Sequence, residues 1–520
     1  MIKVNFQTEK ASCRRRPGAA WTFALVSAGG VMMTLDVTVV NVALSDVARD
    51  LDAGLGRVQW TVSAYSLAFG ALLLTAGALS DRIGRRVVFT AGMGLFTLAS
   101  AACGLAPDAA TLIAARAAQG LGGAMVFAPT LALIAAAYEG ARRQAAIASY
   151  ALVASAAGAL GPVVGGLFAE ALGWRWIFLV NVPIGLLVVA GALARMPESA
   201  ARDTGAGTGP RRRLDPRGSL LAVGALLALH YPLVTGPETG WTAPPVLGSA
   251  ALGVLLTAAL VADQRRGGGL IDMALLRIRA FSGAAVLGFL ARLSSLGMLA
   301  FLTLWLQSTY ASSPLEAGLW LLPLTGSLLL AGLFVNRLQK RFPPDALVAA
   351  GFAAQGLGLL ALAGAGAGAG PAVLVAGLVL LGTGGAVIFP PLMGVAVGTV
   401  PEDRAGMASG LTNACYPLGT ATGVALFGAV FAARLDSALA AGPAGAPPVR
   451  EAVETGRFDL LSPALRPLAH TAFSDAFTTV CLAAAALCAL GVATARTLKA
   501  GPATAAGPAP VAPVRAAEAS

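Results

Sequence analysis

Gly77-Ala-Leu-Ser-Asp81-Arg82-Ile-Gly84-Arg85-Arg86 is a short charged segment that separates two long apolar runs of the chain. A modified copy follows 255 residues later as Gly332-Leu-Phe-Val-Asn336-Arg337-Leu-Gln-Lys340-Arg341. Both copies have a glycine, then Asp or Asn four residues further on, then an arginine and a basic pair. Charged connections of this kind between apolar helices, occurring twice, predict a duplicated membrane protein hinged at its cytoplasmic face.

The composition supports a membrane location. The chain has 520 residues, of which 57% are hydrophobic and 12% are charged, with a mean hydropathy of +0.76. A soluble domain carries about 25% charged residues. Apolar runs of about 20 residues cross a bilayer as helices, because a helix satisfies its own backbone polar groups there. We therefore expect an all-α polytopic membrane protein embedded in a lipid bilayer.

The positive charge is distributed unevenly along the chain. The net charge is +11, and 27 of the 36 Lys and Arg residues fall on the side of the N-terminus, 7 on the other side and 2 within predicted helices. This asymmetry follows the positive-inside rule and predicts that both termini are cytoplasmic, in a multi-pass protein of the cell membrane. The basic charge therefore directs topology, and we do not expect a nucleic acid partner.

The sequence gives no sign of metal or nucleotide chemistry. The five cysteines lack paired spacing and form no cluster with the two histidines, so neither disulfides nor a metal site are expected. The phosphate-binding pattern Gly-x-x-x-x-Gly-Lys-Ser/Thr is absent from the sequence, so ATP is not the expected energy source. We expect a protein that is not an enzyme and has no cofactor.

Fourteen apolar segments organise the chain. The predicted helices span 19–43, 59–79, 87–106, 109–137, 144–169, 174–194, 218–235, 244–262, 281–307, 315–335, 345–365, 371–398, 406–432 and 472–495. The predicted regions are a cytoplasmic N-terminus (1–18), an N-terminal six-helix half (19–194), a cytoplasmic linker (195–217), inserted helices 7 and 8 (218–262), a cytoplasmic loop (263–280), a C-terminal six-helix half (281–495) with an external loop (433–471), and a disordered cytoplasmic tail (496–520).

A second internal repeat confirms the duplication within the sequence. Gly120-Leu-Gly-Gly-Ala-Met-Val-Phe-Ala-Pro129 aligns with Gly382-Thr-Gly-Gly-Ala-Val-Ile-Phe-Pro-Pro391 at an offset of 262 residues. The two six-helix halves are therefore related, and the helices between them are an insertion. Internal repeats around a binding site near the bilayer midplane are typical of secondary transporters.

Several motifs together resemble the 14-helix drug:proton antiporters of the major facilitator superfamily. The segment Gly77–Arg86 is similar to that superfamily's loop between helices 2 and 3. Other similar segments are Leu35-Asp36-Val-Thr-Val-Val-Asn41-Val-Ala-Leu44, Trp174-Arg-Trp-Ile-Phe-Leu-Val-Asn181-Val-Pro183-Ile-Gly185 and Leu214-Asp215-Pro-Arg-Gly218-Ser. Ser45 departs from the pattern, since the family usually has proline there, and we expect only a local change at the end of helix 1.

The resemblance implies a function. It predicts the major facilitator fold and export of amphipathic drugs or antibiotics in exchange for protons, by alternating access and driven by the proton gradient. The alternative is proton-coupled or facilitated uptake of another small solute on the same fold. We expect a monomer whose partners are protons, a small amphipathic substrate and the lipid bilayer.

Helix 5 carries a glycine pattern that resembles the family's antiporter motif, Ser155-Ala-Ala-Gly158-Ala-Leu-Gly161-Pro162-Val-Val-Gly165-Gly166. Three of its glycines share one helix face, so a neighbouring helix can approach closely. Pro162 lacks an N–H group and should bend the helix. The pattern favours a rocking interface, and the alternative is plain small-residue packing. The second half has Val424 where Pro162 would be repeated.

Two ionisable residues lie within predicted helices of the first half. A carboxylate at Asp36 costs a few kcal/mol inside the membrane unless it is protonated, paired or hydrated. Arg116 stays charged at any relevant pH and needs a partner or a wet cavity. The resemblance implies that Asp36, Arg116 and, less strongly, Gln119 take part in proton coupling or substrate recognition. The alternatives are an interfacial Asp36 that is simply hydrated and an Arg116 that only anchors neighbouring helices.

Arg292 is the second intramembrane cation. It precedes Gly332 by 40 residues, nearly the 41 residues between Asp36 and Gly77, which predicts that it lies at about the depth of Asp36 in the repeated half. We expect both residues to face the central cavity, where they either pair or jointly bind a charged substrate. The alternative is that Arg292 points at the inner interface or at lipid headgroups.

The segment Gly77–Arg86 has a mechanical interpretation. Gly84 permits a tight turn, and Asp81 can cap the following helix start. We expect Arg82, Arg85 and Arg86 to seek acids on neighbouring helices, with Glu139 as the nearest candidate partner. Such a cluster can latch one conformation, although exposed pairs are individually weak. The alternative is a purely topogenic arginine cluster.

Overall fold

The computed structural model describes residues 18–197, 215–309, 313–401, 404–439 and 447–498. Most of the predicted N-terminus, linker and C-terminal tail lie outside these residues. Within the described residues the chain is helical, and fourteen spans are long and apolar enough to cross a membrane. The predicted all-α polytopic architecture is confirmed.

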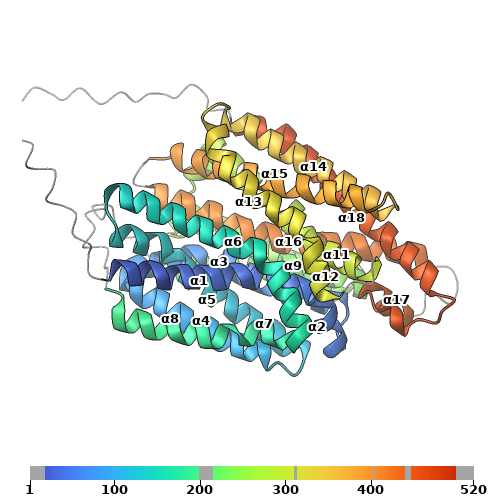
Figure 1. The fold of residues 1–520 in the computed structure, drawn as a ribbon. Coiled ribbons are helices and arrows are strands. Elements are labelled where there is room, and N and C mark those ends of the chain that lie inside the picture. Colours follow the sequence, from blue (N-terminus) through green and yellow to red (C-terminus); the bar gives the residue numbers. More distant parts are fainter. Residues whose placement is uncertain (1–17, 198–214, 310–312, 402–403, 440–446, 499–520) are drawn as a thin grey trace, which may run out of the picture.

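The first half of the chain forms six of these spans, because α7 and α8 together make one (Figure 1). The short α2 is not a span. The elements are α1 (Ala19–Val42), α2 (Leu44–Asp50), α3 (Leu55–Ile83), α4 (Arg85–Gly104), α5 (Ala109–Ala137), α6 (Gly140–Leu172), α7 (Arg175–Leu179) and α8 (Asn181–Arg195).

The inserted pair consists of α9 (Pro216–Thr239) and α10 (Pro244–Arg265). Asp215 caps α9 by accepting a hydrogen bond from the Gly218 N–H at 2.7 Å, and it accepts another from Gln264 of α10 at 2.7 Å. The helix α9 contacts α3 of the first half and α16 of the second. The insertion therefore lies along the seam between the two halves.

The second half forms the remaining six spans, with α12 and α13 sharing one. Its elements are η1 (Leu275–Arg277), α11 (Arg279–Thr309), α12 (Pro314–Trp320), α13 (Leu322–Gln339), α14 (Pro344–Gly366), α15 (Pro371–Gly398), α16 (Ala405–Leu439), α17 (Pro447–Glu454), η4 (Phe458–Leu460), α18 (Arg466–Thr494) and η5 (Ala495–Leu498).

Two predicted helices are broken in the structure, and prolines explain both breaks. The sixth span is interrupted at Val180, where Pro183 cannot donate to the carbonyl of Leu179. The tenth is interrupted at Leu321, where Pro323 has the same effect. The predicted external loop 433–471 also contains helix: α16 continues to Leu439, and α17 follows within the loop.

The two halves lie side by side in Figure 1, with the first half (blue to green) below and the second (yellow to red) above. We call the end that carries α2 and α17 the outer end, and the end that carries the Gly84 turn the inner end. The halves meet through α3 with α16, α6 with α12 and α13, and α1 with α11.

Equivalent glycines bring the halves together. A Cβ atom on Gly166 of α6 would lie 2.6 Å from the Cα of Leu315 in α12. A Cβ atom on Gly428 of α16 would lie 2.5 Å from the side-chain carbonyl carbon of Gln59 in α3. Because 262 residues separate these glycines, they are the two copies of one repeated position, and the contacts follow the internal symmetry.

The outer ends of α1 and α11 are also joined. Gln307 of α11 donates a hydrogen bond to the Val42 carbonyl at 2.9 Å, and Ser45 of α2 donates to the Gln307 side chain. Ser45 is the position where the antiporters that this segment resembles usually have proline, and its hydroxyl takes part in closing this end. The structure is therefore closed at the outer end between α1 and α11.

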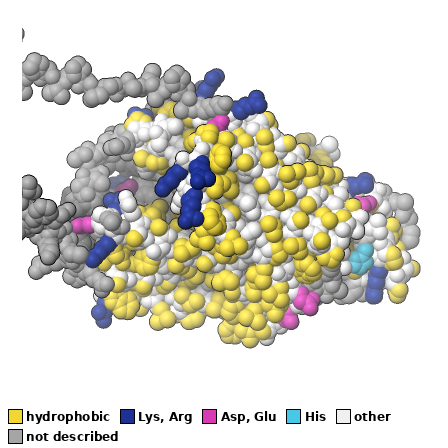
Figure 2. Space-filling view, turned by 45° about the horizontal axis from the view of Figure 1, so that its top comes forward, with side chains coloured by type: hydrophobic (Ala, Val, Ile, Leu, Met, Phe, Trp, Pro, Cys, Tyr) yellow, Lys and Arg dark blue, Asp and Glu magenta, His cyan; other side chains and the backbone are white. Residues whose placement is uncertain are grey.

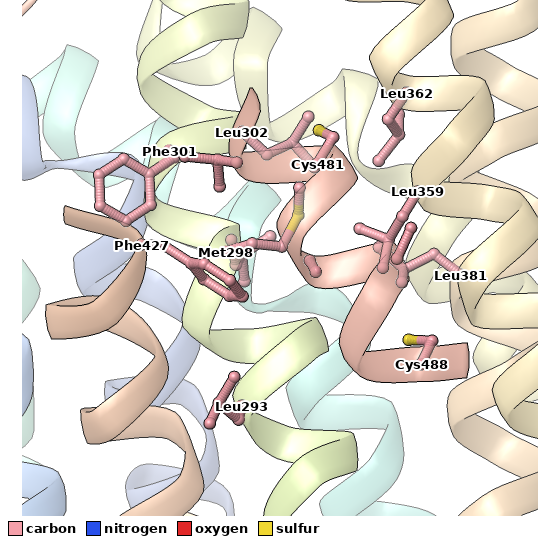
Figure 3. Close-up of a cluster of buried hydrophobic side chains, with 14 of the residues drawn as sticks. Leu293, Met298, Phe301, Leu302, Leu359, Leu362, Leu381, Phe427, Cys481 and Cys488 are labelled. Atoms are coloured by element: carbon pink, nitrogen blue, oxygen red, sulfur yellow. The ribbon is translucent and has the colours of Figure 1, made fainter. Parts of the chain in front are cut away.

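The largest apolar core lies in the second half (Figure 3). Met298 and Leu302 of α11 pack with Phe427 of α16 and with Cys481 and Cys488 of α18, all fully buried. Figure 3 shows leucines of α14 and α15 completing this cluster. The cysteines act here as packing residues. One face of α11 is therefore fixed in the core, and its opposite face is left for other contacts.

The outside of the bundle is apolar (Figure 2). Large hydrophobic side chains are widely exposed, including Leu98 at 71%, Leu187 at 72% and Leu220 at 73%. A soluble protein of this size would not expose apolar surface on this scale. These side chains face the hydrocarbon of the membrane, and the chain is a multi-pass membrane protein.

Candidate functional site

The first half contains a buried ion pair. Asp36 of α1 and Arg116 of α5 are 3% and 1% exposed, and Arg116 Nη1 donates to Asp36 Oδ2 at 2.5 Å. The residues are 80 positions apart in sequence and meet because α1 packs against α5. The predicted need of each residue for a partner is therefore met by the other one. Asp36 is not a hydrated interfacial acid in this structure.

Gln119 joins the pair into a closed network. Its Nε2 donates to Asp36 Oδ1 at 2.8 Å and to Ser100 Oγ of α4 at 2.9 Å, while its Oε1 accepts from Arg116 Nη1 at 2.7 Å. Gln119 is fully buried, one helical turn beyond Arg116 on α5. Both carboxylate oxygens of Asp36 are thus hydrogen-bonded.

The remaining side of the Arg116 guanidinium is also held. Its Nε donates to the Thr61 carbonyl of α3 at 3.0 Å, and the Tyr65 ring lies 4.4 Å from its Cζ. Sequence reasoning did not find Ser100, Thr61 or Tyr65, because one is a common small hydroxyl, one acts through its backbone and one is an ordinary aromatic. The repeat of polar residues along α3 was the available signal.

The ion pair depends on both of its charges. A buried ion pair is stable only while both partners are present, since removing one charge leaves the other uncompensated at a cost of about 3–5 kcal/mol. Protonation of Asp36 removes its negative charge but leaves Arg116 bonded to Gln119 and to the Thr61 carbonyl. The contact between α1 and α5 therefore depends on the charge of Asp36.

The glycine face of α6 lies against α1 beside this network. A Cβ on Gly158 would lie 3.1 Å from the Thr34 methyl, and one on Gly161 would lie 2.8 Å from the Thr38 Cβ. One on Gly165 would lie 2.9 Å from the Val39 carbonyl oxygen. The predicted close approach of a neighbouring helix is present, and the neighbour is the helix that carries Asp36.

The same segment of α6 touches the opposite half. The carbonyl of Pro162 lies directly against Gly318 of α12, and Gly166 contacts Leu315. The repeated position in α16, Val424, is fully buried and packs with Val39 and Val62 of the first half. Pro162 therefore lies between α1 and α12, at the interface of the two halves, where a relative movement of the halves would change its contacts.

The connection between α3 and α4 is shorter than predicted. Only Gly84 separates the two helices, with φ at +113°, so the predicted turn glycine is confirmed. The expected capping by Asp81 is wrong: α3 continues to Ile83, which places Asp81 in its last turn, and no side chain caps α4. Asp81 instead lies 3.9 Å from Arg85.

The other members of this segment lie at the same end of the bundle. Arg86 donates to the Leu193 carbonyl of α8 at 2.7 Å. Arg82 is exposed, Gly77 has open space around its Cα, and Glu139 is the residue directly before α6. Arg86 thus binds a helix carbonyl rather than an acid, and the latch role of the segment stays a prediction.

Arg292 is placed differently from the prediction. Its Cζ lies 4.3 Å from the Phe389 ring centre and 5.9 Å from that of Tyr416, and it does not pair with Asp36. Arg292 is 15 residues before Gln307 and Asp36 is 9 before Ser45. Since those two residues are hydrogen-bonded, a rise of about 1.5 Å per residue puts Arg292 roughly 9 Å nearer the inner end.

An ion pair at the outer end was missed by sequence reasoning. Asp50 at the end of α2 accepts hydrogen bonds from Arg175 of α7 and from Trp174 Nε1, the latter at 3.1 Å. The hydrogen bond from Arg175 holds the pKa of Asp50 below its ordinary value. Both charged side chains are exposed, so this pair positions α2 against α7 at the water interface. Among the described residues no group of His, Cys, Asp and Glu is arranged to hold a metal.

Comparison with known proteins identifies the family. The model of the Major Facilitator Superfamily matches residues 26–424. The multidrug resistance protein Stp of Mycobacterium tuberculosis is 37% identical over 80% of this chain and 77% of its own length. The methylenomycin A resistance protein of Streptomyces coelicolor is 35% identical over 82% and 88%. The tetracenomycin C resistance and export protein of Streptomyces glaucescens is 31% identical over 86% and 84%.

Solved structures give the same fold. A bacterial homologue of the human lysosomal transporter Spinster, in an inward-facing and occupied conformation, superposes with a TM-score of 0.63. It is 14% identical and the match covers 93% of this chain and 97% of that one. Together with the two internal repeats and the fourteen spans, these matches show that the chain belongs to the Major Facilitator Superfamily.

Proposed function

We propose that this protein exports drugs, antibiotics or other amphipathic small molecules from the cell in exchange for protons, by alternating access. The relatives named above are resistance and export proteins, which supports a drug exporter. The positive-inside distribution supports cytoplasmic termini and an inner end that faces the cytoplasm.

One observation carries the proton step. Asp36, enclosed by Arg116 and Gln119, is the only carboxylate of the described residues that is fully buried in an intramembrane ion pair. A proton reaching Asp36 from the outer side neutralises it and frees Arg116. Release of that proton toward the cytoplasm restores the pair. Substrate export is driven because the two states of the pair favour different arrangements of α1 and α5.

Alternating access draws on the glycine contacts. The outer end is closed by the Ser45–Gln307 hydrogen bond and by the two repeated glycines, Gly166 and Gly428. Opening this end requires α6 to slide on α12 and α16 to slide on α3. Helix faces made of glycine allow this movement, because backbones meet there without interlocking side chains.

The function can be tested in everted membrane vesicles from a host that lacks its own drug pumps. A panel that includes methylenomycin A and tetracenomycin C is offered outside, with a proton gradient imposed across the vesicle membrane. We expect accumulation inside the vesicles that collapses when a protonophore is added. Asp36→Asn should insert normally and lose this accumulation.

The alternative, uptake of another solute on the same fold, gives a different result in this assay. An uptake system would move its substrate out of everted vesicles and would leave resistance in whole cells unchanged. Accumulation that survives the protonophore would contradict proton coupling while leaving drug export in place.

A further inference from the structure

The interior of the second half holds a cation that the proposed proton step does not use. Arg292 of α11 stacks on Phe389 of α15, with its Cζ 4.3 Å from the ring centre, and Tyr416 of α16 lies at 5.9 Å. The two rings meet edge to face at 5.0 Å. Two rings, one from α15 and one from α16, thus form an aromatic cage beside the guanidinium group of α11.

The backbone is shaped to hold this cage. Gly288, one turn before Arg292 on α11, lies against the Tyr416 ring, and a Cβ there would come within 3.0 Å of the ring's Cδ1. The core face of α11 is closed by Leu287, Ala291 and Met298, all fully buried. Arg292 itself is only partly buried, whereas Arg116 of the first half is 1% exposed. Part of the Arg292 side chain therefore stays accessible.

No acidic side chain neutralises Arg292 within the part of the chain that the structure describes. The guanidinium forms neither an ion pair nor a hydrogen bond there, in contrast to Arg116. Helices α11 and α15 contain no Asp or Glu. The acid of α16, Asp436, is 20 residues from Tyr416, about 30 Å along the helix.

The energy of this arrangement is unfavourable without a ligand. An unpaired charge in a low-dielectric interior costs several kcal/mol, whereas a cation–π contact recovers about 0.5–2 kcal/mol. The Tyr416 hydroxyl is also buried without a hydrogen-bond partner. Two sets of donors, one of them charged, are thus left without acceptors beside an apolar surface.

We propose that Arg292, Tyr416 and Phe389 form a substrate subsite for the acidic group of a planar amphipathic molecule, so that the exported substrates include organic anions. Phe389 lies over the guanidinium, whose N–H groups have no hydrogen-bond partner among the described residues. That fork matches the two oxygens of a carboxylate. Phe389 and Tyr416 supply flat apolar contact for an adjoining ring system. The inference deepens the proposed export function and rests on it, because a molecule bound here is a substrate only if the protein exports it.

The test uses probes that differ only in the head group. Purified protein in lipid nanodiscs is titrated with 1-pyrenebutyric acid, which is anionic at neutral pH, and with its neutral primary amide, and binding is followed by pyrene fluorescence. We expect the acid to bind at least about tenfold more tightly than the amide, as charged hydrogen bonds of this kind provide. Arg292→Gln should remove this preference while keeping affinity for the amide.

Two further variants separate recognition from folding. Arg292→Lys should keep part of the preference, because a point charge remains without the planar fork. Arg434→Ala removes an exposed arginine of the same half and should leave the preference unchanged. Size-exclusion profiles and thermal midpoints show whether each variant is folded. A wild type without preference for the acid, or a folded Arg292→Gln that retains it, would overturn the subsite.

The subsite and the proposed function can fail separately. Arg292→Gln could lose the preference for the acid while vesicle transport by the wild type is unaffected by the protonophore. That result would support the subsite and contradict proton coupling. Export that the protonophore abolishes, together with an unchanged preference for the acid in Arg292→Gln, would support proton coupling and contradict the subsite.

Discussion

The two related halves of this molecule treat their buried charge in opposite ways. In the first half, Arg116 is paired with Asp36, and Gln119 and the Thr61 carbonyl take up the remaining hydrogen bonds. In the second half, Arg292 lies beside two aromatic rings and has no acidic partner among the described residues. The buried pair of the first half is balanced by itself, whereas Arg292 carries a positive charge that the proposed ligand would neutralise.

The difference shows how a duplicated fold can divide two tasks. A closed ion pair changes state when a proton arrives, because its balance depends on one carboxylate. An open cation changes state when an anion arrives. The repeat supplies the same helix positions to both halves, and the side chains placed there decide which particle each half senses. The assignment of proton and substrate to the two halves is our proposal.

Breaking the pair in the first half should have the largest effect. In Arg116→Gln, Asp36 stays buried without its cation, and we expect the free energy of unfolding to fall by about 3–5 kcal/mol, with loss of transport. SDS titration of the purified protein measures this. The double variant Asp36→Asn/Arg116→Gln should recover much of the stability but none of the transport.

The exposed pair at the outer end is the control for this experiment. Arg175→Gln breaks an ion pair with Asp50 whose side chains are 39% and 47% exposed, and it should cost no more than about 1 kcal/mol. An equal loss of unfolding free energy in Arg116→Gln and Arg175→Gln would contradict the claim that burial makes the Asp36–Arg116 pair the more important one for stability.

Filling the glycine face of α6 should have the next largest effect. In Gly161→Val the added Cβ would lie 2.8 Å from the Thr38 Cβ, and overpacking of this kind costs about 1–3 kcal/mol. We expect α1 and α6 to be forced apart and vesicle transport to be lost. Gly94→Val is the matched control, because nothing lies within 4 Å of a Cβ there. Wild-type transport by a folded Gly161→Val would contradict a role of the glycine face in transport.

Exchanging the residue that differs between the repeated helices should have a smaller effect. Pro162→Ala restores a backbone N–H to α6, so we expect unchanged or higher thermal stability with several-fold slower transport. Val424→Ala in α16 removes apolar contact with the first half and should lower stability instead. Initial transport rates and thermal midpoints of both variants give the comparison. Identical behaviour of the two would mean that Pro162 is only a packing residue.

The smallest effect is expected at the outer pair as pH changes. Because the hydrogen bond from Arg175 lowers the pKa of Asp50, the charged form stabilises the fold above the unfolded pKa of about 3.9. This stabilisation is lost as pH falls through the folded-state pKa. Asp50→Asn should therefore be slightly less stable than wild type at pH 7 and equal to it in strong acid. Thermal midpoints across pH check this, and a difference that grows toward acid would contradict it.

Much of the fold could be predicted from the sequence, since length, hydropathy and two internal repeats constrain the number and pairing of helices. The breaks at Val180 and Leu321 were missed although Pro183 and Pro323 marked them, because hydropathy continues across both. Asp36, Arg116 and Gln119 were found as polar residues in apolar helices. Their meeting could not be predicted, because it depends on how α1 and α5 pack.

The depth of Arg292 shows the same limit. Counting residues to the repeated charged segment placed it level with Asp36, but the structure places it nearer the inner end. Loops of different length between the two copies shift that count, whereas the hydrogen bond between Ser45 and Gln307 gives the level directly. Ser100 of α4 carries no sequence signal of its own and becomes visible only in the folded chain.

Proton movement through Asp36 is the central claim, and proteoliposomes test it most directly. Purified protein is reconstituted with a pH-sensitive dye inside, and an outward drug gradient of tetracenomycin C or methylenomycin A is imposed. Wild-type protein should acidify the lumen as drug leaves, and Asp36→Asn, reconstituted to the same level, should pass no protons with either drug. Drug-dependent acidification by Asp36→Asn at the wild-type rate would contradict the account.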